Sequence, residues 1–295
     1  MIERKSVGSR IFNIFNYILM GLLAFSCLYP LWYTLCLSIS NKAATNAGLV
    51  TFYPIGFSLT SYKEIMGDAA FFNSFWISIK RVFIGTPFTL LVCVMIAYPL
   101  SKNSRTFRLR NPIMWLIVFC MIFNGGTIPW YITMKNYRLI DTMAGLILSG
   151  SLPMFNVILI MNFFKGLPKE MEEAAIVDGA SQWRILFEIV LPCSLPVLAT
   201  ITLFVSVNYW NEYFQGLVLS NTEAHYPLQT YIRQIVVSIP YGTNLSTEQM
   251  IKLSQLSNKS LNAAKVFISM IPMLLIYPWL QKYFVTGITI GAVKE

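Results

Sequence analysis

Apolar runs of about 20 residues, the length needed to cross the hydrocarbon core of a bilayer, alternate along this chain with polar segments. Six such runs predict transmembrane helices. They lie at approximately 14–38, 75–100, 112–134, 140–164, 191–219 and 263–284. The first is longer than the apolar region of a signal peptide, and no small-residue cleavage site follows it, so we expect it to remain as a helix. The pattern therefore predicts an all-α membrane protein with six transmembrane helices.

The basic residues predict which side of the membrane the connections occupy. Lys and Arg gather most densely between the second and third expected helices. The residues of this cluster are Lys102, Arg105, Arg108 and Arg110. Because cytoplasmic loops are enriched in basic residues, this loop and both ends of the chain are expected in the cytoplasm. The polar segments 41–73 and 221–262 are then external, and the cluster itself is interpreted mainly as a topology signal.

A single membrane domain is expected at residues 14–284. A cytoplasmic N-terminus at 1–13 precedes it, and a C-terminal tail at 285–295 follows it. Lys80 and Arg81 fall near the outer end of the second expected helix. Long basic side chains at such a position can reach along the helix toward the polar interface.

Composition supports a membrane protein and argues against other classes. Hydrophobic residues make up 56% of the chain and charged residues 12%, whereas a soluble domain carries about 25% charged residues. The net charge of +9 does not indicate nucleic-acid binding, because the basic residues form short clusters between apolar runs and not one basic groove.

Patterns of catalytic or metal-binding residues are missing from the sequence. The five cysteines lie in or beside apolar runs without CxxC spacing, and the one histidine, His225, lies in a polar segment. We therefore expect neither a metal site nor a disulfide framework. A GxxxxGK[ST] phosphate loop is also missing, so the chain is not expected to hold ATP by that route. We predict a protein that performs no covalent chemistry.

The polar segment at about 165–192 has the pattern of two short helices joined by a turn. Pro168 suits a helix start, where its missing N–H costs nothing. Acidic residues follow in the first turn, where the helix dipole favours negative charge. Gly179 can adopt a positive φ, which ends the first helix and turns the chain.

The second helix of this segment is expected to be amphipathic. Its apolar face is predicted to consist of Trp183, Ile185, Leu186 and Ile189. Pro192 is expected to break it at the membrane surface. Small residues on one face of such a helix–turn–helix let another protein approach closely. The alternative is an ordinary amphipathic connection that lies on the lipid.

The same segment resembles the EAA loop of bacterial ABC importer permeases. Glu173-Ala174-Ala175 is followed, at the spacing of that motif, by Gly179 and by Ile189-x-Leu191-Pro192. In that family the loop forms a coupling helix that sits in a cleft of the ATP-binding subunit. The resemblance implies a polar anchor at Glu173 and close contact at the two alanines. The full set assigned to ATPase coupling is Glu173, Ala174, Ala175, Asp178, Gly179, Ile189, Leu191 and Pro192.

Further segments are similar to MalG-like oligosaccharide permeases. They are Gly48-x5-Pro54-x2-Phe57, Phe72-Asn73-Ser74, Gly125-Gly126-Thr127-Ile128-Pro129, Trp210-Asn211-Glu212-Tyr213-Phe214 and the tail Val285 to Glu295. Phe123-Asn124-Gly125-Gly126 is also similar to permeases for complex or plant-derived oligosaccharides in Gram-positive bacteria. Together with the EAA-like loop, these similarities cover nearly the whole chain.

The resemblance implies the fold, the activity and the partners. The fold is that of type I (MetI-like) ABC importer permeases in the bacterial cell membrane. The activity is ATP-driven import of an oligosaccharide that an extracellular, lipid-anchored binding protein delivers. The implied partners are a second homologous permease, which makes a heterodimer, and a dimeric ATPase that holds ATP and Mg²⁺, with no cofactor in this chain. The tail residues Gly291, Ala292 and Lys294 are implied at the ATPase interface.

Polar residues in the outer half of the fifth expected helix are candidates for the substrate path. Asn208, Asn211 and Glu212 stand beside aromatic residues that include Trp210. Polar residues in a span usually face a bundle interior or a water-filled cavity, and aromatic rings with amide and carboxylate groups suit a sugar. An interfacial aromatic belt and a hydrogen-bond network between helices are the alternatives.

Irregular backbone is expected in the third helix. Gly125, Gly126 and Pro129 free backbone groups there, which is tolerated where they line a cavity or are buried in protein. A gate hinge and a plain helix end at the outer surface both fit. For the whole chain, an ABC permease for a non-sugar solute is an alternative. An ion-coupled secondary transporter is another, although few ionisable residues fall near mid-membrane.

Overall fold

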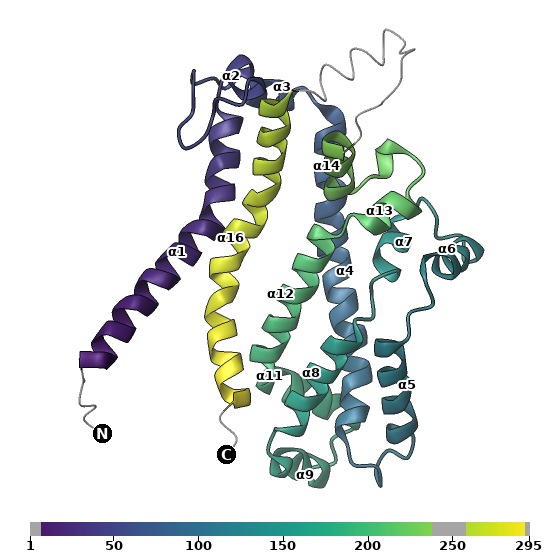
Figure 1. The fold of residues 1–295 in the computed structure, drawn as a ribbon. Coiled ribbons are helices and arrows are strands. Elements are labelled where there is room, and N and C mark those ends of the chain that lie inside the picture. Colours follow the sequence, from purple (N-terminus) through teal and green to yellow (C-terminus); the bar gives the residue numbers. More distant parts are fainter. Residues whose placement is uncertain (1–6, 238–257, 293–295) are drawn as a thin grey trace. The chain divides into compact units, whose positions relative to one another are not determined.

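The computed structural model describes residues 7–237 and 258–292, and every regular element in these residues is helical (Figure 1). The contacts divide the chain into two units, which we describe separately. The first contains Met1–Ala69 and Gln234–Ile271, and the second contains Ala70–Arg233 and Pro272–Glu295.

The first unit is built around the long helix α1. It contains α1 (Val7–Ser38), α2 (Lys42–Asn46), α3 (Thr60–Met66) and the first turns of α16 (Lys259–Ala292). The Ser260 hydroxyl shares a 2.9 Å hydrogen bond with the Ser61 hydroxyl and donates a 3.1 Å hydrogen bond to the carbonyl of Ser40. Lys265 forms a 2.6 Å ion pair with Asp68. The start of α16 is thereby fixed to the segment that follows α1.

Together with α16 from Pro272 on, the second unit holds all or most of each of the remaining helices. They are α4 (Ala69–Ser101), α5 (Arg110–Ile122), α6 (Thr127–Asn136), α7 (Met143–Leu148), α8 (Met154–Lys165), α9 (Lys169–Val177), α10 (Gln182–Arg184), a π-helical segment (Ile185–Val190), α11 (Leu191–Cys193), α12 (Leu195–Asn211), α13 (Phe214–Leu219), a 3₁₀ turn (Glu223–His225) and α14 (Leu228–Val237).

Fewer continuous helices are long enough to cross a membrane than the six that the sequence predicts. Among the described residues, three qualify by length and composition: Gly8–Ser38, Ala69–Ser101 and Lys259–Ile276. The number rises to five if each of two pairs of consecutive helices, sharply bent where they meet, counts as one span. Helix α8 is apolar but has only 12 residues.

The bends lie where the backbone has a local reason to leave the helix. The third expected span is split into α5 and α6, which meet at 117°, and Gly126 at the break has a φ of +85°. This is the irregular backbone expected from Gly125 and Gly126. The fourth expected span is split into α7 and α8, where Pro153 occupies the N-cap position of α8. At the C-terminal end of the chain, α16 continues past the expected end at Phe284 to Ala292.

Helix α4 corrects the expectation for Arg81. The side chain was expected to reach the polar interface, but Arg81 has no exposed surface, whereas its neighbour Lys80 is exposed. Arg81 instead donates hydrogen bonds to three acceptors from distant parts of the chain. A buried charge is tolerated only where such partners replace water.

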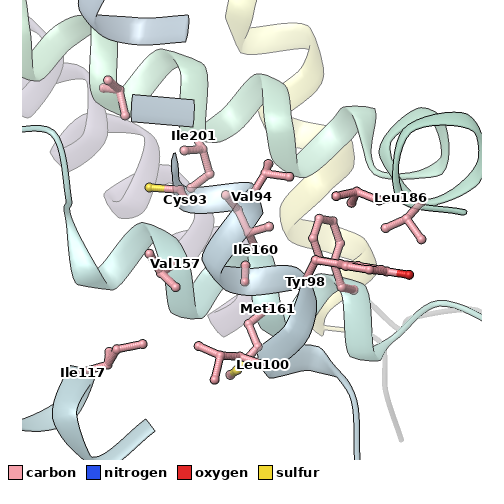
Figure 2. Packing of buried hydrophobic residues seen from close by; sticks show 14 of the residues in the cluster. Cys93, Val94, Tyr98, Leu100, Ile117, Val157, Ile160, Met161, Leu186 and Ile201 are labelled. Carbon is pink, nitrogen blue, oxygen red and sulfur yellow. The ribbon is translucent and has the colours of Figure 1, made fainter. Parts of the chain in front are cut away.

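The core of the second unit lies where α4, α8, the π-helical segment and α12 meet (Figure 2). Cys93 and Ala97 of α4, Val157 and Ile160 of α8, and Ile201 of α12 have no exposed surface. Because lipid tails are as apolar as these side chains, close packing rather than removal from water holds such helices together. This core supports the connection between α8 and α12.

Candidate functional site

The candidate site is the connection between α8 and α12, residues 168–194, which we call the α9–α11 loop. Helix α9 begins after Pro168 at its N-cap, and its first turn carries Glu170 and Glu172. Glu173 is exposed. The first helix of the loop therefore begins as the sequence predicts, with a proline and acidic residues at its positive end.

Gly179 makes the expected turn after α9. Its φ is +78°. Its N–H donates to the carbonyl of Ile176 at 3.0 Å, and the Ala180 N–H donates to the carbonyl of Ala175 at 2.9 Å. This pair of bonds is a Schellman motif, which satisfies the last carbonyls of a helix. A Cβ at position 179 would meet nothing within 4 Å, so the backbone conformation alone favours glycine.

The second half of the loop differs from expectation at Pro192. Ser181 caps the helix by accepting a hydrogen bond from the Arg184 N–H, and the helical run continues to Cys193. The Leu191 N–H bonds to the carbonyl of Leu186, five residues back. This wide π-type pairing lets the chain continue through Pro192, which has no N–H to donate. The break comes at Ser194, where the run meets α12 at 82°.

The buried face of the loop packs against the core. Ile185, Leu186 and Val190 are almost fully buried, and Ile189 and Leu191 are half-buried against the same cluster. Ala175 is buried as well. Of the two alanines assigned to close contact with a partner, only Ala174 faces outward, together with Asp178 and Gly179.

The exposed face of the loop carries several large apolar side chains. Trp183 was expected on the inward face, but it is 58% exposed and stacks on Phe187, with ring centroids 6.3 Å apart. Ile176 and Val177 at the end of α9 are also exposed, Val177 at 86%. Large apolar side chains gathered on an exposed surface mark an interaction site.

Two residues at the end of α4 connect this helix to both halves of the loop. Lys102 forms an ion pair with Glu172 of α9, and its ammonium group lies 4.1 Å from the centroid of the Tyr98 ring. The Tyr98 hydroxyl donates a 3.0 Å hydrogen bond to the side-chain carbonyl of Gln182 in α10. The sequence interpretation took Lys102 as a topology signal and missed this contact.

The polar residues of α12 divide into two groups. Asn208 lines a cavity of about 310 Å³, together with Arg81 and Gln215. Trp210 is buried and packs edge-on against Phe75, with ring centroids 5.6 Å apart. Only the first of these environments resembles a substrate path.

The other predicted path residues do not line this cavity. Asn211 is exposed, and the Glu212 carboxylate accepts hydrogen bonds from the N–H groups of Phe214 and Gln215 at the start of α13. Glu212 thus has the role of a helix cap. Gly125, Gly126 and Pro129 lie at the bend between α5 and α6 and are likewise absent from the cavity lining.

Arg81 joins three elements near this cavity. Its Nε donates to the Leu146 carbonyl of α7 at 3.1 Å, its Nη1 to the Glu212 carbonyl at 3.3 Å, and its Nη2 to the Gln215 side chain. The guanidinium lies 5.2 Å from the centroid of the Tyr209 ring. The Tyr209 hydroxyl in turn bonds to Thr89 at 2.8 Å and to the Ile147 carbonyl at 3.0 Å.

The residues assigned to the C-terminal tail are only partly described. Gly291 and Ala292 belong to the last turn of α16. Lys294 lies outside the described residues. Among the residues with described positions, no three His, Cys, Asp or Glu side chains are grouped so that they could hold a metal ion.

Comparisons with known proteins show the family to which this chain is similar. The family described as "Binding-protein-dependent transport system inner membrane component" matches residues 2–290. The polygalacturonan/rhamnogalacturonan transport system permease protein YtcP of Bacillus subtilis is 34% identical, over 97% of this chain and 99% of its own length. Protein LplC of the same organism is 36% identical, over 97% of this chain and 96% of its own.

A solved structure is similar over almost the full length. It is a crystal structure of a bacterial ABC transporter involved in the import of the acidic polysaccharide alginate. The matching chain is 34% identical, has a TM-score of 0.85, and the similarity covers 95% of this chain and 98% of that chain.

Proposed function

Because this chain belongs to the family of binding-protein-dependent transport system inner membrane components, we propose that it is the permease subunit of an ATP-driven importer that carries an oligosaccharide into a bacterial cell. It pairs with a second, homologous permease and receives its substrate from an extracellular binding protein. ATP and Mg²⁺ are held by a dimeric ATPase on the cytoplasmic side. The chain itself moves the substrate and makes or breaks no covalent bond.

The α9–α11 loop is the observation that carries this proposal. It combines the Glu173-Ala174-Ala175 sequence, the turn at Gly179, and exposed apolar side chains such as Trp183. The buried face of the loop fixes it to the core, so its outer face is presented as one rigid surface. A partner that inserts this surface into a cleft would bury the apolar groups and pair with Glu173.

Charge reversal at Glu173 tests the dock. In the importer assembled with its partner subunits, Glu173→Lys should abolish substrate-stimulated ATP hydrolysis and reduce the ATPase that co-purifies with this chain. Glu170→Lys is the matched control, because it reverses an exposed charge one turn earlier in the same helix, outside the EAA-like sequence. Normal coupling in Glu173→Lys would contradict the docking role.

Substitution at Gly179 tests the same surface through the backbone. Gly179→Val should abolish stimulated ATP hydrolysis although the added side chain meets nothing within 4 Å, because a β-branched residue strongly disfavours a φ of +78°. Membrane insertion should be unchanged. Full uptake and ATPase rates in this variant would remove Gly179 from the proposed dock.

We propose a six-crossing topology with both ends in the cytoplasm, and two contacts support the even numbers of crossings that it requires. The Lys102–Glu172 ion pair puts the segments after α4 and α8 on one side of the membrane, so an even number of crossings separates them. In the first unit, the Lys259 N–H donates a hydrogen bond to the Asn46 side chain. This contact again requires an even number of membrane crossings between the two residues. Six crossings follow if α5–α6 and α7–α8 each cross once. Single cysteines placed in the segments after α4 and after α8, and labelled from one side of the membrane or the other, test this topology.

The sugar substrate is inferred from the relatives, whose names describe transport of polygalacturonan, rhamnogalacturonan and alginate. We propose that Asn208 lies on the substrate path and that Gly291, Ala292 and Lys294 reach the ATPase interface. Uptake of labelled plant- and polysaccharide-derived oligosaccharides into cells with and without this gene tests the substrate class. If deletion of the gene changes the uptake of none of these sugars, the proposed substrate class is overturned.

A further inference from the structure

The cavity beside Asn208 is enclosed by four elements of the second unit. Arg81 comes from α4, Asn156 from α8, Asn208 from α12 and Gln215 from α13, and the rings of Phe155, Phe204 and Tyr209 complete much of the wall. Its volume of about 310 Å³ is at the lower end of the range for small-molecule sites. It can therefore hold a short part of a ligand.

Two amide side chains in this wall make no hydrogen bond to any residue in the described part of the chain. Asn156 is buried, at 6% exposure, whereas Asn208 is exposed. Both line the cavity. Buried polar groups normally find a partner, and an unpaired one requires an explanation. A ligand with hydroxyl or carboxylate oxygens would supply the missing acceptors.

A third amide is oriented by Arg81. The Gln215 side-chain oxygen accepts from Arg81 Nη2, so its NH₂ group is turned away from the guanidinium. A Cβ at position 150 would come within 3.0 Å of that nitrogen, so Gly150 leaves room for it at the cavity wall. Gln215 therefore presents N–H donors, as Asn156 and Asn208 can.

The charge at this cavity is positive. Arg81 lines it, and none of the ten residues of the lining is acidic. Glu212 supplies a negative charge near Arg81, but its carboxylate is held by the N–H groups of Phe214 and Gln215 and does not line the cavity. Little water screens a charge in such a place, so the field of Arg81 acts strongly on whatever enters.

We propose that this cavity binds a uronate unit of the transported oligosaccharide. The three amides donate to its carboxylate and hydroxyl groups, the aromatic rings contact its C–H faces, and the field of Arg81 favours its negative charge. The inference rests on the proposed function and adds a substrate class, acidic sugars, and a site for it in this subunit.

Asn208→Asp tests the charge preference. Substitution of Arg81 is the direct choice, but Arg81 donates three structural hydrogen bonds, so such a variant can fail to fold. Asn208→Asp instead adds a negative charge to the cavity wall with almost no change in shape. Asn211→Asp is the matched control, because Asn211 is exposed on the same helix and does not line the cavity.

The probes are uronate trisaccharides and their fully methyl-esterified, uncharged forms. Transport is measured with the importer assembled with its partner subunits in liposomes. Asn208→Asp should raise the KM for the charged sugars about 10-fold or more, since like charges at close range are strongly disfavoured, and should change the KM for the esters less than about 2-fold. Asn211→Asp should change neither.

The outcomes separate the two proposals. Equal effects of Asn208→Asp on acid and ester, or no effect on either, would overturn the uronate site and leave the importer function intact. Transport of neutral oligosaccharides alone by the wild type would also overturn the uronate site. A wild-type complex that transports no oligosaccharide would overturn the proposed function itself.

Discussion

Lys102, directly after α4, forms an ion pair with Glu172 of α9, which lies 70 residues further along the chain. Both side chains are largely buried, at 17% and 26% exposure. Together with the Tyr98–Gln182 hydrogen bond, this pair connects the end of a membrane-spanning helix to the proposed ATPase dock. We therefore expect a movement of the proposed dock to be transmitted to α4.

Exchange of the two charges tests this connection. Lys102→Glu and Glu172→Lys should each lower the coupling of ATP hydrolysis to uptake, because each leaves two like charges in contact. The double variant should restore at least half of the coupling. Uptake per ATP hydrolysed in the assembled importer is the measurement.

The Arg184–Glu188 pair provides the control for that exchange. It lies in the same loop, but both side chains are at least 60% exposed, and exposed ion pairs contribute little to stability. Reversal of this pair should lower the coupling less than Lys102→Glu or Glu172→Lys does, because solvent screens its two charges. If the exchanged Lys102–Glu172 double variant is as defective as the single ones, the ion pair is not the connection.

Tyr98→Phe isolates the second contact between α4 and the loop. It removes the hydroxyl that bonds to Gln182 and keeps the ring against Phe164, with centroids 6.4 Å apart. A double-mutant cycle with Gln182→Leu should give a coupling free energy of about 0.5–1.5 kcal/mol in unfolding experiments in mixed micelles. A coupling near zero would mean that the hydrogen bond contributes nothing to holding the loop.

Arg81→Met should strongly destabilise the chain. The substitution leaves the carbonyls of Leu146 and Glu212 without their donor in a buried place, and each unsatisfied group costs about 1–3 kcal/mol. We expect a large fall in the thermal midpoint of the purified complex. Lys80→Met is the control, since Lys80 is exposed and its ammonium group lies 5.6 Å from the centroid of the Trp76 ring. Equal midpoints for the two variants would show that Arg81 is not a structural clamp.

Gly85→Ala should displace the ring of Tyr209. An added Cβ would come within 2.8 Å of the Tyr209 Cε2 atom, and that ring is fixed by bonds to Thr89 and Ile147. Overpacking of this kind costs about 1–3 kcal/mol. Gly21→Ala in α1 meets nothing within 4 Å and should be neutral or slightly stabilising, because alanine is the better helix former. The measurement is the unfolding midpoint of each variant, and equal midpoints for the two would contradict the predicted clash with Tyr209.

Local chemistry explains what the sequence could predict. The turn at Gly179 follows from one residue and its neighbours, and so does the break at Gly126, because a positive φ is a property of the local backbone. The start of α9 at Pro168 is equally local. These features were expected and are present.

Long-range contacts explain what the sequence could not predict. The acceptors of Arg81 lie 65 to 134 residues away, and nothing beside Arg81 in the chain indicates that it turns inward. Trp183 lies beside buried Ile185, yet it is exposed because the inward face of the loop is set by packing against the core. The helix continues through Pro192 because a π-helical segment precedes it, and the spacing of apolar residues in the sequence does not predict a π-helix.

The elbow at Ser194 has a mechanical consequence. The helical run that ends at Cys193 meets α12 at 82°, so a push along the axis of that run would act nearly at a right angle to the axis of α12. Such a force produces a torque on α12 about that elbow. Since α12 carries Asn208, the same rotation would move the wall of the proposed sugar site. We therefore expect a small displacement at the proposed dock to change the affinity of that site.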